Sequence, residues 1–84
     1  MRIQAEVSLY PLRTQELSKP VKLFWKTLVQ NTVTIESGAM STRISGDFRE
    51  VFTALESAFT YVAEEYEVIM TVKMSNACPN CGEK

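Results

Sequence analysis

Apolar residues occupy every second position from Ile3 to Leu9, with polar residues between them. This period-two spacing is typical of a strand with one buried face, and Pro11 is expected to end it. Three further segments are rich in β-branched residues or alternate in the same way. Two of them follow the first predicted helix, and the third follows the second. These predicted strands span 32–36, 40–45 and 67–74.

Two other segments repeat apolar residues at every third or fourth position, as amphipathic helices do. In the first, Pro20 suits the opening turn, Ser18 is available as an N-cap, and Asn31 is the expected end. The second is expected to begin after Asp47, an N-cap that Glu50 would complete as a capping box. Its apolar stripe is the strongest of the chain: Phe48, Val51, Phe52, Leu55, Phe59, Val62 and Tyr66.

The predicted order is therefore β-α-β-β-α-β within 84 residues. Right-handed connections fold this order into a ferredoxin-like α+β sandwich, a four-stranded antiparallel sheet with two helices on one face. We expect one domain over residues 1–75, followed by a tail, 76–84, that carries the sequence Cys-Pro-Asn-Cys.

Composition excludes several classes of function. Nine Lys and Arg against ten Asp and Glu leave no positive excess for nucleic acid. The chain has no His, which removes Ser–His and Cys–His catalytic pairs, and no nucleophile lies beside an evident base. No stretch approaches the roughly 20 apolar residues of a membrane span, and no signal peptide is evident. We expect a cytoplasmic protein that is not an enzyme and does not insert into membranes.

The sheet face that the helices leave open is the predicted functional surface. Gln4, Glu6, Ser8 and Tyr10 alternate with the apolar set of the first strand and should point outward. A face of this mixed chemistry is expected to be a subunit interface or a ligand site; the alternative is that its polar residues are only solvated. A domain of this size buries only roughly 60–65% of its unfolded surface, which favours a homodimer or homotetramer.

Two patterns leave alternatives open. Cys78 and Cys81 have the spacing of half a tetrahedral zinc site, whose other half would have to come from a second subunit. The alternatives are a structural loop and, less favoured with so few residues after Cys81, a redox dithiol. No cofactor is otherwise expected. Trp25 beside Phe24 is interpreted as part of the core and its rim rather than as a ligand platform.

Four short motifs, in order along the chain, resemble the YkoF-type thiamine/hydroxymethylpyrimidine-binding family. They are Ser8-Leu9-Tyr10-Pro11, Met40-Ser41-Thr42-x-Ile44-x-Gly46, Val51-Phe52 and Cys78-Pro79. The resemblance spans residues 3–79 and implies a ferredoxin-like fold that binds thiamine or its pyrimidine moiety without catalysis, in thiamine-precursor uptake or salvage. YkoF itself carries two such units in one chain, so this single unit is expected to pair with another copy. Cys81 is not part of the pattern.

The resemblance implies ligand-binding roles for Ser8, Tyr10, Met40 and Thr42, which match the motifs. They would supply hydroxyl, aromatic and thioether groups to an aminopyrimidine on the open face of the sheet. Glu6 is added on chemical grounds, because a carboxylate accepts from an amino group or balances a thiazolium charge. The lack of a basic cluster favours the unphosphorylated vitamin or precursor. The competing hypothesis is an assembly or regulatory module whose open sheet face only pairs subunits.

Overall fold

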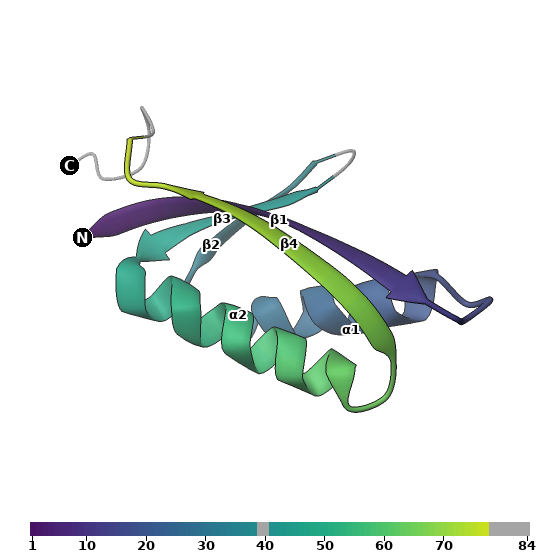
Figure 1. Cartoon of the computed structure of the whole chain (residues 1–84). Coiled ribbons are helices and arrows are strands. Elements are labelled where there is room, and N and C mark those ends of the chain that lie inside the picture. Colours follow the sequence, from purple (N-terminus) through teal and green to yellow (C-terminus); the bar gives the residue numbers. More distant parts are fainter. Residues whose placement is uncertain (39–40, 78–84) are drawn as a thin grey trace.

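Six elements follow one another in the order strand, helix, strand, strand, helix, strand. The computed structural model describes residues 1–38 and 41–77. Its elements are β1 (Arg2–Leu12), α1 (Ser18–Leu28), β2 (Thr34–Ser37), β3 (Thr42–Asp47), α2 (Phe48–Ala63) and β4 (Glu67–Ser75). The strands form one antiparallel sheet in the order β2-β3-β1-β4, and both helices cover the same face of it (Figure 1). The predicted ferredoxin-like fold is confirmed.

The core fills the layer between the sheet and the helices. Every second residue of β1 points into it, and Ile44 of β3 lies beside them. The two helices close the layer with Leu28 and with the inner face of α2. The buried apolar residues are Ile3, Ala5, Val7, Phe24, Leu28, Ile44, Val51, Ala54, Leu55, Ala58 and Val62.

The central strand β1 is longer than the sequence predicted, because it runs through Pro11 to Leu12. Its pairing with β3 ends at Val7, whereas its pairing with β4 continues to Leu12. At Pro11 the strand therefore has a neighbour on one side only, and a missing N–H is tolerated at such a position. This change of neighbours also shapes the site described below.

The start of α1 differs from the prediction. Ser18 is the first helical residue rather than the N-cap, and Leu17, the N-cap, makes no side-chain capping bond. Pro20 lies in the first turn, where backbone N–H groups lack intrahelical partners in any case. The helix ends at Leu28, earlier than expected, and the Asn31 side chain donates to the Thr27 carbonyl at 3.0 Å.

The N-cap of α2 is confirmed. Asp47 accepts a hydrogen bond from the backbone N–H of Arg49 at 3.2 Å. This bond, together with one from the amino group of Met1, lowers the pKa of Asp47 below 3.8. The capping box itself is not formed. Among the described residues, the Glu50 side chain makes no hydrogen bond to Asp47.

The apolar stripe of α2 is wider than its buried face. Val51, Leu55 and Val62 are buried, but Phe48 and Phe52 are 39% and 46% exposed. Their rings contact each other edge-to-face with centroids 4.8 Å apart. The prediction that both phenylalanines belong to the core-facing stripe is therefore wrong. They lie on the flank of the helix.

The last strand, β4, ends at Ser75. The predicted tail motif lies outside the described residues, as does Met40. Neither of the described helices is long and apolar enough to span a membrane.

Candidate functional site

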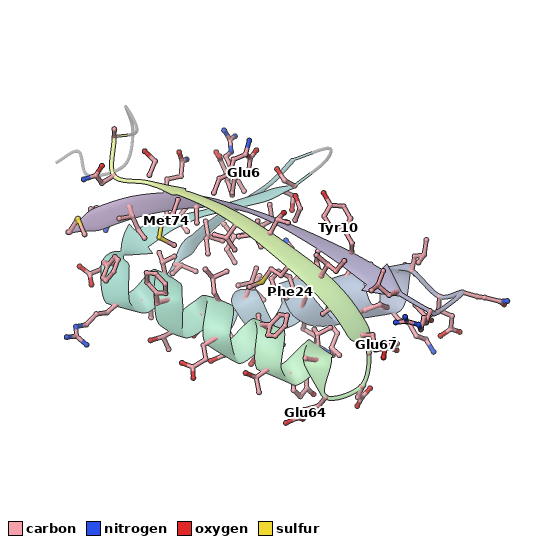
Figure 2. The ribbon with its side chains drawn as sticks, in the orientation of Figure 1. Glu6, Tyr10, Phe24, Glu64, Glu67 and Met74 are labelled. Atoms are coloured by element: carbon pink, nitrogen blue, oxygen red, sulfur yellow. The ribbon has the colours of Figure 1, made fainter. Side chains whose placement is uncertain are left out.

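Three of the predicted ligand residues lie on the open face of the sheet. Glu6 and Tyr10 project from β1 on the side away from the helices (Figure 2), and Ser8 shares their alternation. Glu6 is flanked in register by Arg43 of β3 and Lys73 of β4. The carboxylate is therefore placed between two cationic strand neighbours.

The fourth described residue, Thr42, lies on the other face. It is opposite Val7 of β1 and Ser37 of β2, and both Val7 and Thr42 therefore point toward the helices. The expectation that Thr42 joins Glu6 and Tyr10 on the open face is thus corrected by the strand register. Met40 cannot be placed, since it is outside the described residues.

The structure instead offers a cleft of about 510 Å³ between α1 and the sheet, which we call the α1 cleft. It lies where β1 has lost its β3 neighbour, beyond Val7. Its apolar lining comes from both layers: Val7, Leu9, Val21, Phe24 and Trp25. Phe24 is 4% exposed, whereas Trp25 is 41% exposed. A buried ring and a half-open indole therefore lie side by side in the lining.

Residues that carry hydroxyl groups border the apolar lining. Ser8, Ser37, Ser41 and Thr42 all border the α1 cleft. Ser37 accepts a hydrogen bond from the indole Nε1 of Trp25 at 3.1 Å, which fixes the ring against β2. The cleft thus combines one large flat ring with the side chains of Ser37 and Thr42, whose hydroxyl groups can both donate and accept hydrogen bonds.

One contact connects the cleft to the open face. The hydroxyl of Ser41, which borders the cleft, donates to Oε2 of Glu6 at 3.0 Å. Ser8, the residue of β1 two positions further on, borders the cleft as well. Glu6, Ser8 and Thr42 are therefore neighbours of a single site, although they do not share a sheet face, while Tyr10 does not line it.

Charge around the site is sparse. Lys22 is the one charged residue that borders the α1 cleft among the described residues. Arg43, beside Glu6, forms an ion pair with Glu36 at 2.9 Å, so its charge is partly balanced within the sheet. Such a site offers little to a diphosphate, which is usually bound by several positive groups or a helix N-terminus.

Trp25 is the site residue that sequence reasoning missed. It was assigned to the core and its rim, and the packing is consistent with a rim position. Its unusual feature is a half-exposed indole beside a cleft, which depends on where α1 crosses the sheet. The available signal in the sequence was a tryptophan directly after Phe24, at the margin of the apolar stripe.

No group of three or more potential metal ligands occurs within residues 1–38 and 41–77. Cys78 and Cys81 lie outside these ranges, so the zinc site shared between subunits stays a prediction.

The fold and the cleft define a ferredoxin-like domain with a candidate site between its first helix and its sheet. A family model described as the YKOF-related family matches residues 2–81. The chain belongs to this family.

Solved structures give the same fold. A hypothetical protein of Methanocaldococcus jannascii is 27% identical, with a TM-score of 0.82 over 94% of this chain and 84% of that one. A Bacillus cereus domain of unknown function is 22% identical, with a TM-score of 0.80 over 100% of this chain and 83% of that one. A Thermotoga maritima protein described as a "putative thiamine biosynthesis/salvage protein" is 11% identical, with a TM-score of 0.81 over 92% and 85%. A comparison with curated proteins gave no match.

Proposed function

We propose that this protein binds thiamine or its hydroxymethylpyrimidine moiety, without catalysis, in the α1 cleft. The observation that carries the proposal is the half-exposed Trp25 in a cleft that four hydroxyl-bearing residues border. The description of the Thermotoga relative and the family itself are consistent with this ligand class. On this proposal the protein is a cytoplasmic binding protein that serves thiamine-precursor uptake or salvage.

The volume and lining of the α1 cleft suit a small flat ring. About 510 Å³ lies within the roughly 300–1,000 Å³ typical of ligand pockets. The pyrimidine would stack on Trp25, and stacking of aromatic rings contributes roughly 0.5–1.5 kcal/mol beyond area burial. Its polar edge would meet the hydroxyls of Ser37 and Thr42.

Charge sets the orientation of the ligand. The ammonium group of Lys22 disfavours a thiazolium cation at its side of the cleft, whereas Glu6, bound to Ser41, favours a cation at the opposite side. The neutral pyrimidine therefore occupies the cleft, and a thiazolium, where present, extends toward Glu6. A diphosphate carried on the thiazolium would lie near the Glu6 carboxylate, which repels it. Arg43 and Lys73 beside Glu6 each have a carboxylate neighbour, so the unphosphorylated forms bind more tightly.

Calorimetric titration with thiamine, hydroxymethylpyrimidine and thiamine diphosphate tests the proposal. We expect the two unphosphorylated ligands to bind, and Trp25→Leu to weaken them about tenfold through the loss of stacking. Trp25→Phe keeps an aromatic face and should lose less. The absence of binding by all three ligands at millimolar concentration would remove the proposal.

The open face of the sheet supports a second function, self-association. Tyr10 and Ile69 lie opposite each other in register on this face and are 52% and 48% exposed. We propose that this apolar pair, with Leu12 beside it, packs against a second copy in a homodimer or homotetramer. If this were the protein's sole role, as in the competing hypothesis of an assembly module, Tyr10→Asp would lower the sedimentation mass and no ligand would bind the cleft.

A further inference from the structure

The two edges of the sheet are protected to different extents. At one edge lies β2, which has four residues, and at the other lies β4, which has nine. No strand in the described part of the chain pairs with the outer edge of β4. It contains no proline, and its register with β1 is unbroken from Glu67 to Ser75, so no bulge interrupts it. A long, regular edge strand is a template for pairing with another chain.

An apolar groove of about 450 Å³ lies between this edge strand and α2, and we call it the β4 groove. Val72 and Met74 face α2 from the sheet, yet they are 36% and 37% exposed. Phe52 borders the groove from the helix and is 46% exposed. Helix-facing side chains of a sheet are normally buried, so the groove is open at the side where another strand would lie.

The charges of β4 favour one pairing partner. The strand carries two charged residues, Glu67 and Lys73, of opposite sign. Both alternate onto the open face, and they lie three residues before and three residues after Met70. A two-fold axis through Met70 is the one antiparallel register that places Glu67 of each strand opposite Lys73 of the other. Opposite charges across a strand pair are stabilising, and like charges are destabilising.

We propose that β4 pairs antiparallel with β4 of a second copy of this chain, about a two-fold axis at Met70. In this register Val68 of one copy lies opposite Val72 of the other, on the helix side. The two sheets join into one continuous sheet, and the same surface of both copies is used, as a two-fold interface requires.

This pairing covers the apolar surface that the monomer leaves open. The second copy's strand closes the β4 groove at its side, and the main-chain groups of both edges gain partners. The interface is distinct from the open sheet face and from the α1 cleft. It depends on neither a ligand nor the proposed function.

The first test places a lysine on the helix-facing side of β4. Lysine is common on natural edge strands, where its charge prevents pairing with another chain. Val72→Lys should lower the mass measured by sedimentation equilibrium by one association step, with dimerisation weakened about 100-fold, because a charge would face Val68 of the other copy. The matched control is Tyr61→Lys. Tyr61 is a large side chain on α2 that is 52% exposed and does not line the β4 groove. It should leave the mass unchanged.

The second test uses the charges and keeps the helix side intact. Glu67→Lys and Lys73→Glu should each weaken self-association about tenfold, since like charges then face each other twice. Mixing the two variants restores both opposite-charge pairs, and the mixture should regain the wild-type mass. Arg13→Ala is the control for the ion pair of Glu67 with Arg13 at 2.6 Å, and it should not change assembly.

A wild-type monomer at about 100 μM, a concentration at which dimers with Kd in the micromolar range are assembled, would overturn the proposal. So would an unchanged mass for Val72→Lys. Failure of the mixed charge variants to associate better than each alone would overturn the register at Met70. Circular dichroism confirms folding of each variant. Titration of Val72→Lys and Tyr61→Lys with hydroxymethylpyrimidine is expected to match the wild type, because neither residue borders the α1 cleft, so the outcome is separate from ligand binding.

Discussion

Two hollows of similar size lie between the helices and the sheet, and their linings differ in kind. The α1 cleft, about 510 Å³, has four hydroxyl-bearing residues around its aromatic lining. The β4 groove, about 450 Å³, has Glu56 as its only polar lining residue within the described chain. An apolar hollow with several polar groups suits a small ligand that must be oriented, whereas a hollow with an almost wholly apolar lining suits another protein surface.

The difference arises from the position of each hollow in the sheet. The α1 cleft forms beside the central strand β1, where the β2–β3 hairpin ends and contributes Ser37, Ser41 and Thr42. The β4 groove forms at the sheet edge, where the helix-facing residues of a regular strand are all apolar. Hairpin ends carry polar turn residues and strand interiors carry apolar ones. The topology therefore places ligand chemistry on one side of the molecule and association chemistry on the other.

The largest expected effect comes from the core that both hollows share. Leu28, the last residue of α1, is fully buried, so Leu28→Ala should lower the free energy of unfolding by about 3 kcal/mol. Urea denaturation measures this change. Ligand affinity and self-association should then fall together, and a loss of only one would show that the hollows do not depend on a common core.

A crossed pair of variants separates the two hollows. Trp25→Ala should weaken ligand binding roughly tenfold and leave the sedimentation mass unchanged, because Trp25 does not line the β4 groove. Phe52→Ala should show the reverse. Both side chains are more than 40% exposed, so neither change should cost the stability that Leu28→Ala does. If either variant impaired both properties, the division into ligand and association surfaces would be wrong.

Removing a single hydroxyl tests the polar lining of the cleft. Thr42→Val keeps the shape of the side chain and removes one donor and acceptor, so ligand affinity should fall about fivefold, the magnitude of one neutral hydrogen bond. Calorimetry measures the loss, and Thr53→Val on α2 is the control, since Thr53 is exposed and does not line the cleft. Unchanged affinity in Thr42→Val would place the ligand elsewhere.

Local patterns were sufficient to predict the fold. Alternation from Ile3 to Leu9 and the stripe of α2 gave the element order, and the right-handed connections gave the sheet. The face of Thr42 also followed from the pattern, because Thr42 and the buried Ile44 are two residues apart on one strand. Assigning Thr42 to the open face followed the functional motif instead of this alternation.

The α1 cleft and the β4 groove were beyond local patterns. Each depends on distances between elements that are far apart in the sequence: where β3 stops pairing with β1, and where α2 lies relative to the edge strand. The helical stripe included Phe48 and Phe52 because a stripe of this width has no marker for its flank. Likewise, the apolar residues of β4 are typical of any half-buried strand. Its position at the edge follows only from the order of the strands in the sheet.

The smallest expected effect concerns acid and the wall of the β4 groove. Asp47 caps α2, which forms one side of that groove, and its pKa in the folded state is lowered by the Arg49 N–H and the Met1 amino group. A lowered folded-state pKa adds stability that is present above the unfolded-state value, near 3.8, and is lost as the pH falls through the folded-state value. The urea midpoint should therefore decrease between about pH 5 and about pH 3. Asp47→Asn keeps a capping oxygen without a titrating group, so its midpoint should decrease less over this range.

Since α1 has no such cap, ligand binding at the α1 cleft should be less sensitive to this acid step than self-association through β4. Equal pH dependence of the wild-type and Asp47→Asn urea midpoints would show that the Asp47 cap does not contribute to acid sensitivity.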